Sequence, residues 1–145
     1  MIIHNQTIEL ETVKGISLNN ISDQVCDVIA TSKVQNGVLT VNSMHTTTAL
    51  CINEFESRLL DDVRLFFHDL VPPQNKYLHN DIHLRDCPQD EPENAHAHLL
   101  SMLLGNSESI IICDGVMQLG RWQSLIMLDL DGPRKRCVGV QIMGE

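Results

Sequence analysis

The sequence is short of basic residues and has no long apolar run, and each absence excludes a class of protein. Only 10 Lys and Arg accompany 19 Asp and Glu, so the formal net charge is −9. A nucleic-acid-binding protein normally presents a basic face, which this balance does not favour. No stretch approaches the roughly 20 apolar residues that a membrane-spanning helix needs, and the first residues lack the basic start and apolar stretch of a signal peptide. We therefore expect a cytoplasmic protein that binds neither nucleic acid nor membrane.

Paired cysteines and the common cofactor motifs are also missing. The five cysteines are odd in number, form no C-x-x-C pair and mostly have apolar neighbours. We expect them to be small, reduced core residues in a reducing compartment rather than disulfides or a zinc–cysteine site. The G-x-x-x-x-G-K-[ST], G-x-G-x-x-G and H-E-x-x-H motifs do not occur. Nucleotide-cofactor and zincin functions therefore have no support.

The length and the apolar patterns favour one domain, residues 1–145, of mixed helices and strands. The expected elements are a strand over residues 2–10, a helix over 21–32, strands over 37–44 and 49–53, a helix over 57–70, an irregular segment over 72–93, a helix over 94–104, and strands over 109–113, 116–119, 122–130 and 136–143. The last four strands form a meander with Asp-Gly turns. We therefore predict an α+β domain with a largely antiparallel sheet and two to three helices.

A histidine followed by three threonines, His45 to Thr48, lies between two of the expected strands, and Glu54 directly follows the second. Element ends on a rigid scaffold are where sites are usually built. An imidazole, a row of hydroxyls and a carboxylate close to that imidazole suit an enzyme or a metal-binding protein. We expect His45 and Glu54 to lie near one another.

The other histidines fall into two segments. His79 and His83 lie in the irregular segment 72–93, whose aromatic and histidine content favours a functional loop. On the helix over 94–104, Asn94 and His98 are four residues apart and face the same way. His96 and His98 lie about 200° apart around the axis and cannot share a site. We expect His4, His68 and His96 to be surface or hydrogen-bonded residues.

Two patterns near the C-terminus have two interpretations each. Trp122, the only tryptophan, is either a core residue at the start of a strand or, with Gln123, a flat wall for a ring-bearing ligand. The segment from Asp129 to Arg136 is either a charged hairpin turn or a turn that presents Arg134 to a phosphate or carboxylate. Spacing alone does not choose between these interpretations.

Several short motifs occur in a fixed order: His45-Thr46-Thr47, Ile52-Asn53-Glu54, Tyr77-x-His79, Asn94-x-x-x-His98-Leu99, Gly115 to Gly120, Trp122-Gln123 and Asp131-Gly132-Pro133-Arg134. Together they resemble the YjbQ family, also called the secondary thiamine-phosphate synthase family. The resemblance runs from about residue 35 to the C-terminus. Two departures affect the mouth of the expected pocket. Arg121 stands where the family more often has a small residue, and Thr48 is an additional threonine.

The resemblance implies a compact, sandwich-like α+β domain that assembles as a homotrimer, with a polar pocket at the subunit interface. His45, Glu54, His98 and Arg134 would be the catalytic residues, with Glu54 beside His45 and Arg134 binding an anion. The substrate-binding residues would be Thr46, Thr47, Asn53, His79, Asn94, Trp122 and Gln123.

Three functions are compatible with these residues. The first is an enzyme for a small phosphorylated substrate, with the weak thiamine-phosphate synthase activity that the resemblance implies, aided by a divalent cation such as Zn or Mg. The second is a metal-dependent hydrolase or metal-binding protein that uses His45, His79 and His98. The third, a non-catalytic ligand binder or structural trimer, is the least favoured because a structural interface needs no group of titratable side chains.

Overall fold

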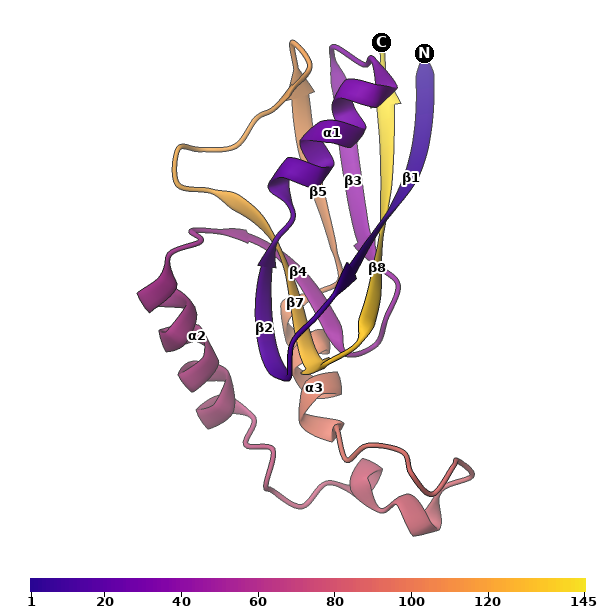
Figure 1. Cartoon of the computed structure of the whole chain (residues 1–145), viewed down its shortest axis with the longest axis vertical. Coiled ribbons are helices and arrows are strands. Elements are labelled where there is room, and N and C mark those ends of the chain that lie inside the picture. The colour runs from indigo at the N-terminus through magenta and orange to yellow at the C-terminus, as the bar shows by residue number, and fades with distance from the viewer.

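A computed structural model describes all residues, 1–145, and contains two antiparallel sheets and three α-helices (Figure 1). The elements are β1 (Ile2–Glu11), β2 (Gly15–Asn20), α1 (Ser22–Ser32), β3 (Gly37–Ser43), β4 (Thr48–Asn53), α2 (Ser57–Leu70), the 3-10 turns η1 (Leu78–Asn80) and η2 (Ile82–Leu84), α3 (Ala95–Leu104), β5 (Ser107–Cys113), β6 (Val116–Met117), β7 (Ser124–Gly132) and β8 (Lys135–Gly144). The predicted α+β domain with largely antiparallel strands is confirmed. No helix in it is both long enough and apolar enough to cross a membrane.

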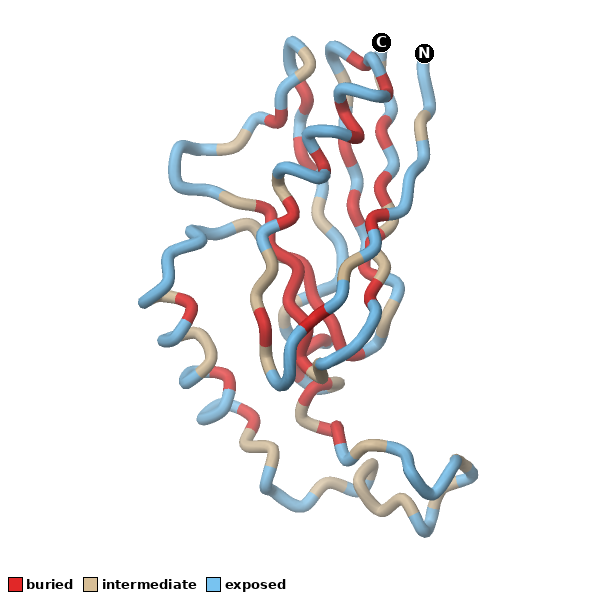
Figure 2. The backbone as a smooth tube through the Cα atoms, in the orientation of Figure 1, coloured by how far each residue is buried: buried red, intermediate tan, exposed pale blue.

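The two sheets divide the molecule into layers. The larger has the strand order β1-β8-β3-β5-β6 and the smaller β2-β7-β4. The main core lies between one face of the larger sheet and a layer formed by α1 and the smaller sheet. A second apolar cluster lies on the outer face of the smaller sheet, where α2 and α3 cover it. Both clusters draw residues from β7, so this strand is buried on both faces (Figure 2). Burial on both faces explains its apolar run Leu125–Leu128.

One strand, β2, was not predicted from the sequence. β2 pairs with β7, although its residues look like a helix N-terminus in the sequence. Apolar and polar residues alternate over 16–19, but the buried position is the polar Ser17, between the half-buried Ile16 and Leu18. Asn20 does serve the helix that follows, since its side-chain oxygen accepts a hydrogen bond from the Ser22 N–H at 3.0 Å.

The helix predicted over 57–70 is α2, and its apolar stripe is only partly buried. Leu60 and Phe67 pack inward, but Phe66 and Leu70 remain more than half exposed. The stripe is wider than the part of the smaller sheet that it covers. The helix is also capped by Glu56 rather than by Ser57, because the Glu56 carboxylate accepts the N–H groups of Arg58 and Leu59 at 3.0 and 2.8 Å. These hydrogen bonds lower the pKa of Glu56.

The prediction that the cysteines are core residues was wrong. All five are free, none is buried, and Cys26 and Cys113 are exposed. In β5 and β8 the reason is the two-residue period of a strand. Cys113 follows the buried Ile112, and Cys137 lies between buried neighbours, so both point to the opposite face of the sheet.

Candidate functional site

The loop that carries His45 is the crossing between the two sheets. β3 ends in the larger sheet at Ser43, and β4 begins in the smaller sheet at Thr48. The hydroxyls of these two residues are hydrogen-bonded to each other, and the Thr47 carbonyl accepts the Leu130 N–H at 3.0 Å. The row of threonines thus fixes the loop to both sheets and holds His45 at their junction.

A buried ion pair lies beneath this loop. Arg136 donates two hydrogen bonds to Asp129, at 3.0 and 2.8 Å, and a third to the Thr47 hydroxyl at 2.8 Å. Arg136 is 4% exposed and Asp129 is fully buried. Burial alone would raise the pKa of Asp129, but hydrogen bonds from Arg136, from the Thr12 hydroxyl and from the Asp131 N–H outweigh it and hold that pKa below its usual range.

Sequence reasoning missed this pair as part of the site. The available signal was a carboxylate inside the apolar run of β7, since a buried charge is seldom found without a partner. The pair joins β7 of one sheet to β8 of the other, so it fixes the angle at which the two sheets meet below His45.

His45 is held in one tautomer. Its Nε2 accepts a hydrogen bond from the Cys137 N–H at 2.8 Å, so a neutral ring carries its proton on Nδ1. Burial lowers the pKa of His45, and the nearby guanidiniums of Arg136 and Arg134 lower it further, against an opposing effect of Asp129. His45 is therefore a neutral imidazole with a single N–H to donate.

His98 lies on the other side of the same hollow. The two rings line an open pocket of about 350 Å³ together with Thr46, Ser101, Met102, Gly105 and Asn106. The Ser101 hydroxyl donates to the Thr48 carbonyl at 2.6 Å and so ties α3 to the start of β4. The sequence prediction that brought His45, Thr46 and His98 together is therefore consistent with the fold.

His79 joins this group through η1. Its ring meets His98 edge to face, with 4.7 Å between the ring centres. Burial is the largest cause that lowers the pKa of His98, and the nearby His79 lowers it further. Arg85 donates to the His79 carbonyl at 2.8 Å and holds the 3-10 segment in place. The irregular segment thus places His79 against His98, although His79 does not itself line the pocket.

Arg134 and Asn94 also converge, and they meet at a residue that the sequence analysis did not select. Asn94 donates to one oxygen of Asp131 at 2.7 Å, and Arg134 donates to the same oxygen at 2.8 Å. The Arg134 side chain keeps 40% of its surface exposed. Asp131 therefore orients the guanidinium of Arg134 while leaving part of it open to an anion. The segment is a charged turn, as the first interpretation predicted, and the binding of a phosphate or carboxylate by Arg134 stays a prediction.

The other predicted site residues lie at the opposite end of the smaller sheet. Asn53 pairs with Ser124, whereas Thr48 pairs with Asp129. A strand rises about 3.3 Å per residue, which places Glu54 roughly 20 Å from the start of β4. The expectation that Glu54 lies near His45 was therefore wrong within one chain, because β4 is extended between them. Glu54 is exposed.

Trp122 and Gln123 lie at this far end as well. Trp122 is 64% exposed, and the Arg121 guanidinium lies 4.8 Å from its ring centre, so it is not a core residue. The Gln123 side-chain oxygen accepts the Gly120 N–H at 2.7 Å, which stabilises the turn before β7. The flat aromatic surface predicted from the sequence is available, but in a single chain it does not face the pocket histidines.

His45, His79 and His98 do not form a ligand set for a metal within one chain, and no other group of three or more His, Cys, Asp or Glu does so. A metal-bound histidine normally donates its second ring N–H to a neighbour. His45 does the opposite, since its Nε2 accepts a hydrogen bond from Cys137. As they lie in the single chain, these histidines therefore do not fit zinc or magnesium.

A family model described as "UPF0047 protein YjbQ-like" matches residues 6–145. The chain belongs to the YjbQ family. The match extends the resemblance, which the motifs carry only from about residue 35, to β1 and β2.

Members of the YjbQ family share both sequence and fold with this chain. A UPF0047 protein of Methanothermobacter thermautotrophicus is 38% identical over 145 residues, covering 100% of this chain and 95% of the relative. A YbjQ-like protein of unknown function from Sulfolobus solfataricus is 30% identical, with a TM-score of 0.88 over 99% of this chain and 98% of that one. A hypothetical protein from Aeropyrum pernix is 31% identical, with a TM-score of 0.89 over 98% of this chain and 99% of that one. None of these names states a reaction, so the function must be argued from the site.

Proposed function

We propose that this YjbQ-family protein is a cytoplasmic enzyme for small phosphorylated substrates, with thiamine-phosphate synthase activity. The observation that carries the proposal is the single hollow lined by His45 and His98, close to the oriented guanidinium of Arg134. The substrates would be a pyrimidine pyrophosphate and a thiazole phosphate. The carbon–oxygen bond to pyrophosphate breaks, pyrophosphate leaves with the electron pair, and the thiazole nitrogen forms the new carbon–nitrogen bond.

This reaction asks the protein to position two molecules and to stabilise charge rather than to form a covalent intermediate. Negative charge grows on the departing pyrophosphate. The Arg134 guanidinium, the ring N–H groups of His45 and His98, and the Thr46 hydroxyl are the donors that the chain offers to it. Positive charge grows on the thiazole nitrogen, where a carboxylate such as Glu54 would stabilise it.

Glu54 reaches that position only if a second chain supplies it, which supports assembly as a homotrimer. Apolar side chains are exposed beside both groups of site residues. Met102 and Leu103 of α3 are 78% and 67% exposed near His98, and Phe55 and Trp122 are exposed near Glu54. Covering these surfaces with another copy would bring the Glu54 end of one chain to the His45 end of its neighbour.

Turnover of the two substrates by His98→Gln protein tests the proposal. Removing one preorganised donor from such a site typically costs about 100-fold in rate. His83→Gln is the matched control because His83 is exposed and lies outside the pocket. Equal turnover by both variants would contradict the assignment of His98, and no turnover by the unaltered protein would contradict the reaction itself.

A further inference from the structure

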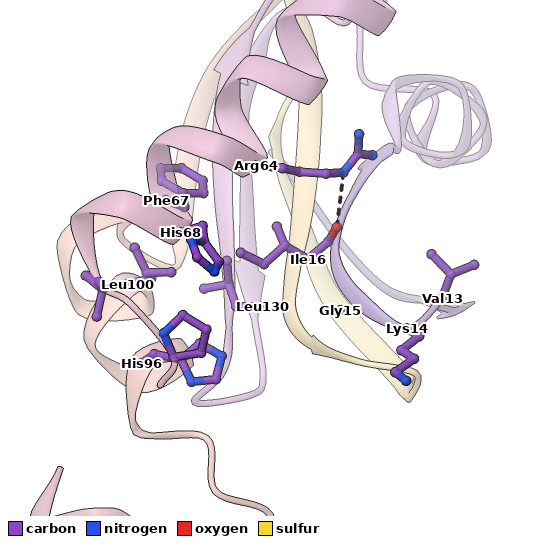
Figure 3. Close-up of a pocket in the computed structure, with 12 residues that line it drawn as sticks. Val13, Lys14, Gly15, Ile16, Arg64, Phe67, His68, His96, Leu100 and Leu130 are labelled. Carbon is purple, nitrogen blue, oxygen red and sulfur yellow. Dashed lines mark hydrogen bonds between the residues drawn. The ribbon is translucent and has the colours of Figure 1, made fainter. Parts of the chain in front are cut away.

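A second and larger cavity, shown in Figure 3, is lined from α3 by His96 and Leu100. It has a volume of about 570 Å³ and opens between α2, α3, the start of β2 and the end of β7. This size falls within the usual range for small-molecule sites. His96 lines this cavity, whereas His98 lines the candidate site, as their angle around the helix requires.

The ionisable side chains that line the cavity are all lysine, arginine or histidine. Its lining contains Lys14, Arg64, His68 and His96, and no Asp or Glu. The chain as a whole carries 19 acidic residues against 10 Lys and Arg. Because its lining has no carboxylate, the charge around this cavity is opposite in sign to the negative net charge of the molecule. Such a cavity suits an anion.

Arg64 is held in position by two contacts within the chain. Its Nε donates to the Ile16 carbonyl at 3.2 Å, and its Nη1 pairs with Asp61 at 2.7 Å. Its Nη2 forms no hydrogen bond within the chain. The guanidinium is thus oriented before any ligand arrives and retains donors for it.

His96 carries an unpaired polar atom at the same cavity. Its Nδ1 is buried and has no hydrogen-bond partner. This atom is enclosed by protein, so a ligand in the open cavity does not reach it, and His96 contributes only to the wall. His68 lies on the same side of the cavity as His96, so the two rings flank one part of its wall (Figure 3).

The rest of the wall is apolar. Phe67, Leu100 and Leu130 form its buried base, and Ile16 and Val71 continue it. An inorganic anion alone would leave this surface in contact with water. An apolar ring or short chain placed on it would bury that surface while its anionic group reached the basic rim.

We propose that this cavity is a binding site for a small amphipathic organic anion, one with an apolar ring or chain and a single carboxylate or phosphate. The anionic group would bind the free Nη2 of Arg64, and the apolar part would rest on Phe67, Leu100 and Leu130, with His68 and His96 beside it (Figure 3). The proposal does not depend on the reaction at the candidate site.

Calorimetric titration with matched probes tests it. The probes are 1-naphthoate, 1-naphthyl phosphate and the neutral 1-naphthamide, which share one ring system and differ in charge. Either anion should bind the native assembly at least about tenfold more tightly than the amide, since a hydrogen bond to a charged group is roughly twice as strong as a neutral one. Equal affinity for all three probes, or no binding of either anion, would overturn the proposal.

Two variants of one helix locate the binding. Arg64→Gln should weaken binding of the preferred anion about tenfold or more, whereas Arg58→Gln, an equal loss of charge on α2 outside the cavity, should leave it within about twofold. If Arg64→Gln does not fold, His68→Gln replaces it, because that side chain is 54% exposed. Equal effects of the α2 variants would refute the site. So would anion binding that weakens as protein concentration rises, because a second copy would then occupy the cavity.

Discussion

The two ends of the smaller sheet differ in how the chain supports them. At the His45 end, almost every polar group is bonded to another part of the protein, down to the buried pair of Arg136 and Asp129. At the Trp122 end, the side chains are exposed and their hydrogen bonds are local, as that of Gln123 to Gly120 shows. The His45 half of the predicted pocket is therefore preorganised by its own chain, whereas the Trp122 half is exposed without such support.

This difference explains the division of roles between the two ends. A group that stabilises charge must be held before the substrate arrives, which needs buried support from several elements. A wall that comes into place when another chain packs against it needs exposed aromatic and apolar side chains instead. Four measurements test this difference between the two ends of the smaller sheet.

Arg136→Met should give the largest loss. It leaves the carboxylate of Asp129 buried without its partner, which typically costs about 3–5 kcal/mol of unfolding free energy. Urea denaturation measures the loss. Lys135→Ala, at the exposed neighbouring position, should change the unfolding free energy by less than about 0.5 kcal/mol. A double variant, Arg136→Met with Asp129→Leu, should recover most of the loss, and a double variant as unstable as the single one would argue against this account.

Mixing two inactive variants tests whether the two ends meet across subunits. His98→Gln and Glu54→Gln should each lose turnover alone. When the chains are unfolded together and reassembled in equal amounts, about a quarter of the sites should contain both intact residues, and activity should return to about a quarter of the original. Mixing without reassembly is the control. Reassembled protein that stays inactive would show that Glu54 does not complete the site of a neighbour.

The pH dependence of stability should reveal the neutral imidazoles of the His45 end. Burial holds the pKa values of His45 and His98 below those of the unfolded chain. The neutral rings therefore contribute stability that is present above about pH 6.5 and is lost as the pH falls through the lower folded-state pKa values. Unfolding free energies from pH 8 to pH 5 should decrease less steeply in His98→Gln than in the unaltered protein. A parallel decrease in both proteins would be inconsistent with this assignment.

Arg121→Ala should have the smallest effect. Its guanidinium lies over an exposed ring, where such a contact is worth about 0.5–1 kcal/mol. The unfolding free energy should change by no more than that, with Arg58→Ala as an exposed arginine control. A loss as large as that of Arg136→Met would show that the Trp122 end is supported as firmly as the His45 end.

The sequence predicted those helices and strands whose apolar residues gather on one face. β3, β4 and α3 were found within a residue or two, because turn residues bound them and their apolar positions repeat. β2 was missed because its central buried residue is a serine. The burial of the cysteines was misjudged because apolar neighbours along a strand lie on the opposite face from the residue between them.

The candidate site was predictable as a set of residues but not as an arrangement. His45, Thr46 and His98 line one pocket, and Asn94 and Arg134 share Asp131. The motif order gave no indication that β4 places Glu54 at the other end of its sheet. Asp129 and Arg136 were missed because their importance comes from a contact between two sheets, which local patterns do not record.

The position of α3 has a thermodynamic consequence. The helix is a common wall between two cavities, with His96 facing one and His98 the other, and Asp131 acts electrostatically on both rings. Occupants of the two cavities are thus subject to linkage through one short helix. If an anion beside His96 changes the affinity for a substrate beside His98 by some factor, the substrate must change the affinity for the anion by that same factor.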